Sequence, residues 1–534
     1  MTDPGYRDAV MPPWDRWAET SAGAHQHFAR LQRRLAATTT AALGTTRRSV
    51  VVLPSRAVDR WHEPPAETQS YEERMLSLLF ELQDPGLELT YVTSLPVARR
   101  TIDYYISILP RRSRLSARRR LRLVSLGDGG QRPLSEKLLA RPRVLDQIRG
   151  SLAGRRVAYL MPYNSTAVER EIALSLDIPV YGADPEHVWL GSKSGARAVF
   201  ASAGVPHPVG AEQIRSIADA ADAICALRAV KPGLTELVIK LDNAVSGEGN
   251  ALLDLTGLPA PGSAAERQLI EQRLAGAAPE VDGVTPSAFL GKLAEQGGVV
   301  EERITAREVR SPSVQLWIAP SGAVDLLSTH DQILHGRSEQ RFAGCRFPAD
   351  RAYAPVVSAL AQRVGEHLAD LGVIGPLAVD FLVVRNEHDW QPFALEVNLR
   401  MSGTTHPYQT LSRLTHGSYD PQTASFTTRR GHSRHYVATD HLELPQLQVL
   451  GHAGLLARAG RPDLRFDHTH GRGVVFHMLS SIEPLATVGV TAIAESPERA
   501  DDLHAHVRAV LANPSNRQAF RERPSIRPAL DTPG

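Results

Sequence analysis

The stretch FALEVNLRMSGTTHP, residues 393–407, carries three polar side chains at alternate positions of an apolar run. Glu396, Asn398 and Arg400 are two residues apart, and on a β-strand this spacing points all three side chains to one face. Hydroxyl-bearing and small residues follow at once, from Ser402 to Thr405. This strand end is a candidate functional site, because a carboxylate, an amide and a guanidinium share one face just before that segment.

A second candidate strand, residues 377–384, precedes this stretch and contains Asp380. A polar turn at residues 385–389 joins this strand to the quoted stretch, so the two strands are predicted to pair as a hairpin. In that pairing the side-chain oxygens of Asp380, Glu396 and Asn398 converge. Two carboxylates and an amide suit Mg²⁺, a hard cation that keeps waters and binds phosphate. The same residue types also occur by chance in many strands, where they have surface or structural roles.

Two segments further upstream have the features of a nucleotide site. Residues 237–240 form an apolar strand that ends in Lys240, and the glycine-rich loop AVSGEGN follows at residues 244–250. A lysine at this place can meet phosphate oxygens that the backbone N–H groups of the loop cover. The loop lacks the Gly-Lys-Ser/Thr ending of a Walker A loop, and many glycine-rich turns are turns alone. The segment GVVEERI, residues 298–304, can present backbone groups to an adenine edge with Glu308 near the ribose, or it is a solvated charged turn.

Composition narrows the class of protein. The chain has 534 residues, of which 42% are hydrophobic and 22% charged, with a formal net charge of +2. This balance argues against a protein that binds nucleic acid through bulk charge. Two cysteines in so long a chain favour free thiols in a reducing compartment. Since no signal pattern or membrane-length apolar run is present, we expect a cytoplasmic enzyme that binds neither nucleic acid nor a membrane.

The order of the predicted elements divides the chain. Strands alternate with helices in residues 47–190, which predicts parallel pairing in a three-layer α/β domain. The Pro-, Ala- and Thr-rich residues 1–46 precede this domain as an extension. Residues 191–420 mix helices and strands, and residues 421–534 are predicted as a small α+β domain that a loop or linker rich in Ser, Thr, Arg and Gly introduces.

The order of the motifs resembles the ATP-grasp superfamily over roughly residues 190–420: lysine, glycine-rich loop, Val-Val-Glu-Glu, Asp, then Glu-x-Asn-x-Arg. The resemblance implies a pre-ATP-grasp domain at 47–190, an ATP-grasp core of two α+β subdomains that grip the nucleotide at 191–420, and a substrate-related domain at 421–534. Several stretches are also similar to the pheganomycin-type peptide ligases: VVLPS (51–55), YEERM (71–75), MPYN (161–164), SPSVQ (311–315), THDQI (329–333), GCRFP (344–348), the residues 398–407 and GVVFHM (473–478).

The resemblance implies a role for each site residue. The implied nucleotide-binding residues are Lys193, Lys240, Ser246, Gly247, Gly249, Asn250, Glu301, Arg303, Ile304 and Glu308. The implied metal ligands are Asp380, Glu396 and Asn398, and the implied substrate-binding residues are Arg400, Ser402, Gly403, Thr404 and Thr405. Arg400 and Lys240 would also act in catalysis. His330 is a further candidate, either for orienting substrate or for a structural hydrogen bond.

The activity implied is a ligation that depends on ATP and Mg²⁺. A substrate carboxylate attacks the γ-phosphate to give an acyl phosphate and ADP, and an amine then displaces phosphate to form an amide. The expected partners are a small carboxylate or amino acid and an amine or peptide acceptor, in natural-product or modified-peptide biosynthesis; a homodimer is compatible with this. Two alternatives stay open: an ATP-grasp kinase that phosphorylates a hydroxyl, and a non-catalytic nucleotide-binding protein.

Overall fold

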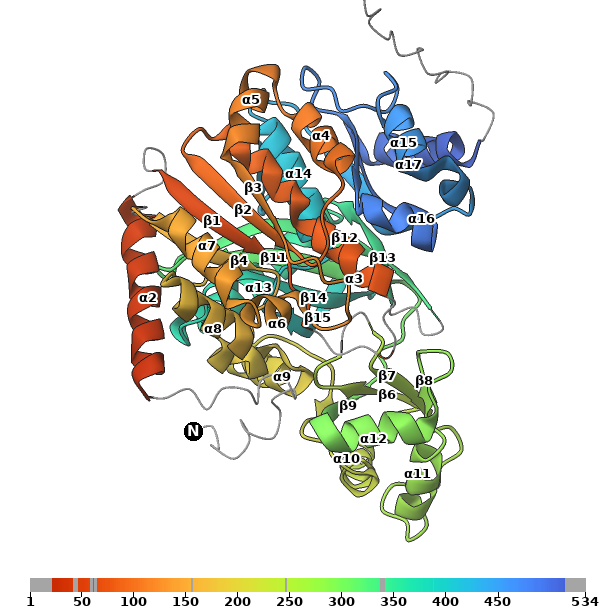
Figure 1. Ribbon diagram of the computed structural model, residues 1–534. Helices are drawn as coiled ribbons and strands as arrows, with labels where there is room; N and C mark the ends of the chain where they lie inside the picture. Colours follow the sequence, from red (N-terminus) through yellow and green to blue (C-terminus); the bar gives the residue numbers. More distant parts are fainter. Residues whose placement is uncertain are drawn as a thin grey trace, which may run out of the picture.

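The computed structural model describes residues 22–41, 47–57, 61, 65–154, 157–244, 247–336, 341–387 and 389–513. Within these ranges the strands form sheets of four, five and nine strands and one two-stranded hairpin. Figure 1 shows a large body that contains the four- and nine-stranded sheets, and a smaller lobe below it that contains the five-stranded sheet.

The N-terminal part of the body is a parallel sheet in the order β3-β2-β1-β4. Along β1, Val50 and Val52 pack into one hydrophobic cluster and Val51 and Leu53 into another, so helices cover both faces of the sheet. This confirms the predicted three-layer α/β arrangement. The elements are α2 (Ala22–Ala41), β1 (Arg48–Leu53), α3 (Pro65–Glu72), the 3₁₀ segment η2 (Glu73–Gln83), β2 (Leu87–Thr93), α4 (Arg99–Ile108), α5 (Arg111–Arg120), β3 (Leu121–Ser125), α6 (Leu134–Leu139), α7 (Pro142–Leu152), β4 (Val157–Pro162) and α8 (Ala167–Leu176).

The smaller lobe is an antiparallel sheet in the order β5-β9-β6-β7-β8, with its helices packed on one face. Its core is a separate cluster to which Ile224, Ile239, Leu274 and Phe289 contribute. The elements are β5 (Gly210–Ala211), α10 (Ile217–Val230), β6 (Glu236–Leu241), β7 (Asn250–Asp254), α11 (Glu266–Leu274), β8 (Ala278–Pro279), α12 (Pro286–Gln296) and β9 (Gly298–Glu302).

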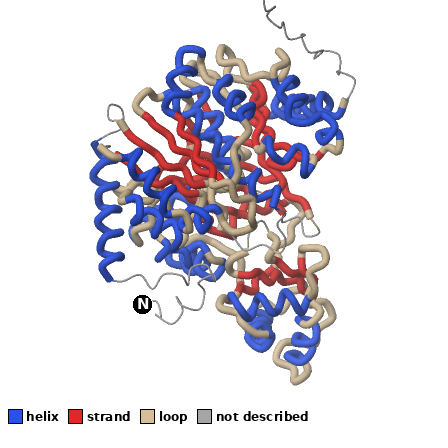
Figure 2. Tube along the Cα trace, viewed as in Figure 1, coloured by secondary structure: helices blue, strands red, loops and turns tan. Residues whose placement is uncertain are grey.

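The nine-stranded sheet runs β10-β14-β11-β12-β13-β18-β20-β19, and β15 pairs with β14. The red strands of this sheet lie through the centre of the body in Figure 2. Its strands are β10 (Val309–Arg310), β11 (Pro312–Ile318), β12 (Val324–His335), β13 (Arg341–Phe347), β14 (Gly375–Arg385), β15 (Trp390–Asn398), β18 (His435–Glu443), β19 (Gly473–His477) and β20 (Thr487–Ala494). Around it lie η3 (Pro185–Gly191), α9 (Lys193–Ser202), α13 (Ala354–Asp370), α14 (Thr405–Thr415), α15 (Gln446–Ala459), η4 (Leu479–Ser481), α16 (Ile482–Leu485) and α17 (Pro497–Ala512).

The C-terminal strands extend the central sheet instead of forming a sheet of their own. Cys345 on β13 pairs with Ala438 on β18, and β18 then pairs with β20. The segment predicted as a loop or linker contains the short hairpin of β16 (Ser418–Asp420) and β17 (Ser425–Thr427). The division of the chain at residue 420 therefore stays a prediction, and one sheet crosses it.

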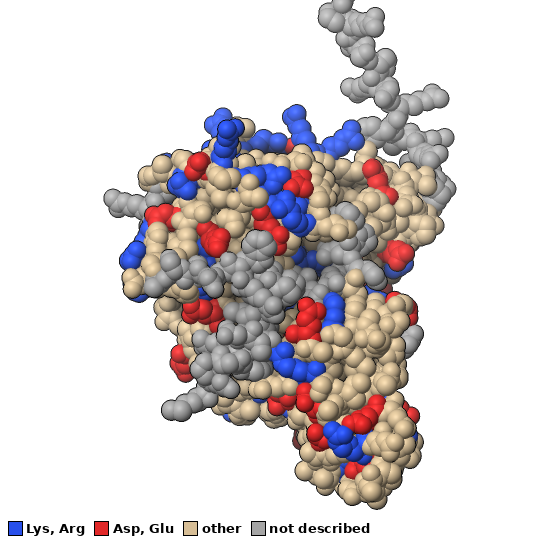
Figure 3. Space-filling view, turned by 60° about the horizontal axis from the view of Figure 1, so that its bottom comes forward, with Lys and Arg blue, Asp and Glu red and all other residues tan. Residues whose placement is uncertain are grey.

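The surface carries charges of both signs. Lys and Arg are interspersed with Asp and Glu over the face in Figure 3, where basic side chains also gather along the upper edge. The basic run of residues 111–122 forms the helix α5 and the first two residues of β3. In the part of the chain that the structure describes, no helix combines the length and apolar character that a membrane span requires.

Candidate active site

The predicted hairpin at the centre of the site is present. Strands β14 and β15 pair antiparallel, which places Asp380 directly opposite Glu396. The Asn398 amide nitrogen donates to Asp380 Oδ2 at 3.1 Å, and the Arg400 guanidinium donates to Asn398 Oδ1 at 2.5 Å. The structure thus brings together the three polar residues that the period-two spacing predicted to share one face and Asp380, which the predicted hairpin placed beside them.

Two half-buried carboxylates, those of Asp380 and Glu396, face one another in this hairpin. Burial and the charge of Glu396 raise the pKa of Asp380 to about 6. Burial acts in the same direction on Glu396, but the cations of Lys193 and Arg400 outweigh it and hold the pKa of Glu396 below its usual range. The Lys193 ammonium lies 2.8 Å from Glu396 Oε1 and also donates to the carbonyl oxygen of Ala244 at 3.3 Å.

The donor set fits Mg²⁺. Among the described residues no three His, Cys, Asp or Glu side chains form a closed metal cage. Asp380, Glu396 and Asn398 offer two carboxylates and one amide instead, and Mg²⁺ typically combines one or two carboxylates with waters and substrate phosphates. Burial and then the charge of Glu396 raise the pKa of Asp380, and a divalent cation between the two carboxylates would offset their repulsion.

A cavity of about 550 Å³ lies between the five-stranded sheet and the hairpin. Lys240, at the end of β6, forms a buried ion pair with Glu301 on β9, which also accepts from Arg197 at 2.9 Å. Burial alone would raise the pKa of Glu301, but these two cations outweigh burial and lower it. The residues of the sequence prediction that line this cavity are Lys193, Lys240, Gly247, Gly249, Asn250, Glu301, Arg303, Ile304, Asp380 and Glu396.

The glycine-rich loop has a steric reason for its composition. Gly247 has φ +76°, in the left-handed region that favours glycine. A Cβ on Gly249 would lie 2.1 Å from the Cβ of Ala244, so the loop can fold back on itself only when position 249 has no side chain. Ser246 lies outside the described residues.

Three predicted residues take positions away from the cavities. The Glu308 carboxylate accepts from Arg310 at 2.8 Å and is absent from the lining of the large cavity. His330 is fully buried, its Nε2 lies 2.6 Å from the Tyr436 hydroxyl, and burial lowers its pKa to about 3. Its position corresponds to the structural alternative, because the side chain points into the core while the next residue, Asp331, lines the cavity. Thr405 begins α14 and accepts from the Ser402 backbone at 2.8 Å.

A second, smaller cavity of about 150 Å³ adjoins the first. Both cavities are lined by Asp380, Glu396, Gly247 and Gln332, so the paired carboxylates stand at their junction. The smaller cavity is also lined by Asn398, Arg400, Ser402, Gly403 and Thr404 from the quoted stretch. A volume of this size suits a small molecule such as an amino acid.

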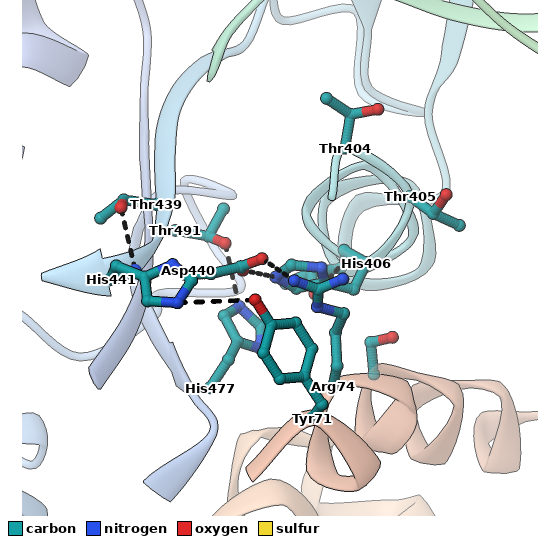
Figure 4. Close-up of polar contacts among 12 residues, drawn as sticks. Tyr71, Arg74, Thr404, Thr405, His406, Thr439, Asp440, His441, His477 and Thr491 are labelled. Atoms are coloured by element: carbon teal, nitrogen blue, oxygen red, sulfur yellow. Dashed lines mark hydrogen bonds and ion pairs between the residues drawn. The ribbon is translucent and has the colours of Figure 1, made fainter. Parts of the chain in front are cut away.

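The opposite wall of the smaller cavity comes from distant parts of the chain, and sequence reasoning assigned it no role. The ring of Tyr71 lies between the guanidinium groups of Arg56 and Arg74, 3.7 Å and 4.3 Å from its centroid. Arg74 forms a buried ion pair with Asp440 on β18, as Figure 4 shows. The sequence held one indication of this part of the site: the stretch YEERM at residues 71–75, which is similar to the peptide ligases, contains two of these residues.

Comparison with known proteins identifies the family. Residues 187–276 and 284–422 match the family described as "IQCH-like, ATP-grasp", and residues 454–507 match the "PGM1 C-terminal domain" family. The L-propargylglycine–L-glutamate ligase of Streptantibioticus cattleyicolor is 30% identical over 478 residues, which cover 87% of this chain and 94% of that protein. The chain belongs to the ATP-grasp ligases. The resemblance that the sequence motifs indicated is thereby confirmed.

More distant relatives share the ATP-grasp fold. The IQ motif-containing protein H of Danio rerio is 24% identical over 397 residues, 66% of this chain and 37% of that protein. The biotin carboxylase domain of 2-oxoglutarate carboxylase from Hydrogenobacter thermophilus, crystallised with MgADP, has a TM-score of 0.51 at 13% identity, covering 86% of this chain and 89% of its own. Biotin carboxylase from Campylobacter jejuni has a TM-score of 0.50 at 14% identity, covering 87% of this chain and 95% of its own.

The family settles the class of reaction and its cofactor. This ATP-grasp ligase is an ATP-dependent carboxylate–amine ligase, and ATP is its cofactor. The large cavity has the volume of a ligand site, and the buried residues Lys193 and Lys240 line it.

Proposed function

We propose that this ATP-grasp ligase joins the carboxylate of a small acid or amino acid to the amine of a second amino acid or peptide, through an acyl phosphate. The observation that carries the proposal is the junction of the two cavities at Asp380 and Glu396. A nucleotide in the large cavity and a carboxylate in the small one would meet at that junction. Arg400 lies beside it, where negative charge develops on the transferring phosphoryl group.

The nucleotide site is assigned as follows. Lys193 and Lys240 bind phosphate oxygens, and the backbone of Gly247, Gly249 and Asn250 covers them. The β9 end, Glu301 to Ile304, holds the adenine. Closure of the glycine-rich loop over the phosphates would exclude water, which otherwise hydrolyses the acyl phosphate. In the structure the ammonium group of Lys193 pairs with Glu396 and that of Lys240 pairs with Glu301, which holds both side chains at the cavity.

The metal and acid sites lie on the other side of the junction. Asp380, Glu396 and Asn398 would hold Mg²⁺, which when bound supplies positive charge to the β- and γ-phosphate oxygens. The hydroxyl groups and N–H donors of Ser402 to Thr404 orient the acid. The pocket is close-fitting there, since a Cβ on Gly403 would lie 2.5 Å from the ring of Phe342. The acid therefore enters with its carboxylate against Arg400.

The relative in Streptantibioticus cattleyicolor acts on L-propargylglycine and L-glutamate by its name. We propose that this chain likewise joins two amino-acid substrates, one of them of the glutamate type. Arg56, Arg74 and Arg400 surround the small cavity with three guanidinium groups, which favours a substrate with a second carboxylate. Cys225 and Cys345 are free thiols, in keeping with a reducing compartment such as the cytoplasm.

Hydroxylamine trapping tests this function. The protein is incubated with MgATP, hydroxylamine and single L-amino acids or small dicarboxylates, and hydroxamate and ADP are measured. Hydroxamate formed with one acid, in step with ADP, would establish the acyl phosphate and name the acid. Phosphate transferred to a hydroxyl group, with no hydroxamate from any acid, would overturn the proposal in favour of a kinase. Size-exclusion chromatography of the same preparation tests the expected homodimer.

A further inference from the structure

Strand β18 is irregular where it passes the smaller cavity. Thr439 pairs with Val490 and Leu442 with Val488, so Asp440 and His441 together face the single residue between those partners on β20. Two residues opposite one form a β-bulge, which redirects side chains that would otherwise point to opposite faces. Both Asp440 and His441 line the cavity as a result.

The bulge is held by specific hydrogen bonds. The backbone N–H of His441 donates to Thr439 Oγ1 at 3.1 Å, and the Thr439 hydroxyl donates to the carbonyl oxygen of Ala343 at 2.6 Å. The His441 imidazole is directed toward Tyr71, whose hydroxyl lies 3.5 Å from His441 Nε2, as Figure 4 shows. Three segments far apart in the chain therefore fix an imidazole in the wall opposite the metal carboxylates.

Amide formation requires a proton acceptor in this cavity. An α-amino group has a pKa of about 8, so near neutral pH much of the amine substrate arrives as the ammonium ion, which has no lone pair for attack. A positioned base that takes this proton typically contributes about 100- to 10,000-fold to the rate. The acceptor has to touch the cavity in which the acyl phosphate forms.

The other groups of the wall are poor acceptors. Guanidinium groups stay protonated, and Asp380 and Glu396 are the proposed metal ligands. Asp440 pairs with Arg74 and contacts the imidazole of His406, and these interactions outweigh burial and hold the pKa of its carboxyl group well below the usual range. Burial raises the pKa of Tyr71, which stays protonated. Among the described residues that line the small cavity, His441 carries the imidazole, the side chain suited to proton transfer near neutral pH.

We propose that His441 is the general base of the amide-forming step, an inference that rests on the proposed ligase function. Its neutral imidazole accepts a proton from the substrate ammonium group, and the released lone pair attacks the acyl carbon. The carbon–oxygen bond to phosphate then breaks, and its electron pair leaves with the phosphate, which carries away the second excess proton as hydrogen phosphate. The products are the amide, hydrogen phosphate and a protonated His441, which solvent deprotonates.

The charged groups near His441 tune this role. Asp440 adjoins it in the chain, and the guanidinium groups of Arg56 and Arg74 lie over the ring of Tyr71, which contacts it. The carboxylate of Asp440 is shared between Arg74 and His406, so it anchors the bulge instead of competing for the proton. Asp440 is thus a positioning residue for the proton acceptor.

The test compares two nucleophiles in the full-length His441→Gln variant. The acid is the one that hydroxylamine trapping identifies, and the amine is drawn from a pool of L-amino acids, with the dipeptide detected by mass spectrometry. Hydroxylamine is a weaker base than an aliphatic amine and is largely unprotonated at neutral pH, so it needs no proton acceptor. We expect amide formation to fall about 100-fold or more while hydroxamate formation stays within about twofold of wild type.

A matched histidine and a pH profile complete the design. His506→Gln alters an exposed histidine of α17 that pairs with Asp463, and both reactions should stay at the wild-type rate. Amide formation by the wild type should decline on the acidic side as a histidine is protonated, whereas in His441→Gln the decline should follow the ionisation of the amine itself, near about pH 8. The proposal is overturned if His441→Gln keeps its amide-forming rate, or loses both reactions equally. A wild type that forms no hydroxamate would overturn the ligase function itself, and this inference with it.

Discussion

The buried ion pair between Arg74 and Asp440 gives the sharpest prediction about stability. It joins η2 to β18, and the exposed fractions of the two side chains are 7% and 3%. Asp440→Asn keeps the shape of the side chain but leaves the guanidinium buried without its counter-charge, which costs about 3–5 kcal/mol. A folding unit of 150–250 residues loses about 2–4 °C in Tm per kcal/mol, so we expect Asp440→Asn to melt about 10 °C below wild type.

Scanning calorimetry at neutral pH measures this difference. A matched control is Glu495→Gln, because Glu495 pairs with Arg472 at 3.0 Å in the same part of the chain while both side chains are about half exposed. An exposed pair contributes at most about 1 kcal/mol, so the control should melt close to wild type. The double variant Arg74→Met/Asp440→Asn removes both charges and should be destabilised by less than the sum of the two single variants.

The pH dependence of this stability has a definite sign. Arg74 and His406 lower the pKa of Asp440 in the folded state below its unfolded value of about 3.9. The contribution of Asp440 is therefore complete above about pH 4 and is lost as the pH falls toward the folded-state pKa. The gap in Tm between wild type and Asp440→Asn should narrow in strong acid. A variant that melts within about 2 °C of wild type at pH 7 would refute the assignment of a tight buried pair.

Further predictions concern the nucleotide and the metal. Glu396→Gln should abolish ADP and hydroxamate formation with a wild-type circular dichroism spectrum, and EDTA should stop the wild-type reaction until Mg²⁺ is added back; turnover in either case would remove the metal assignment. Lys240→Met should weaken ATP binding about tenfold or more by calorimetric titration, because a buried cation at the phosphates is lost, whereas Lys292→Met on α12 should bind normally. Gly249→Ala should also weaken ATP binding, since its Cβ would overlap a methyl carbon at 2.1 Å, whereas Gly233→Ala meets nothing within 4 Å and should bind as wild type does.

Several features of the site followed from local sequence pattern. The period-two spacing of Glu396, Asn398 and Arg400 specified one face of a strand, and the polar turn before it specified a hairpin partner that carries Asp380. Alternating strands and helices likewise predicted the parallel sheet of the N-terminal part. These inferences held because strand periodicity and short-range pairing are set by residues close together in the chain.

Other expectations about site residues depended on whether each side chain points into the core or toward a cavity. His330 and Asp331 are neighbours on β12, but the alternation of the strand sends the first into the core and the second to the large cavity. Glu308 follows residues 298–304 closely in sequence, yet it does not line the large cavity and instead pairs with Arg310, which does. Sequence alone did not say which face would be buried, because that depends on what packs against the strand.

The amino-acid sequence by itself determined the family, the class of reaction and the row of polar side chains at the end of β15, since motif order and periodicity are local properties of the chain. Only the tertiary structure decided that Arg74 and Asp440, 366 residues apart, meet in one cavity wall. The same holds for the bulge that turns His441 into that cavity. Contacts of this kind form when separate sheets and helices pack together, and no spacing along the chain encodes them.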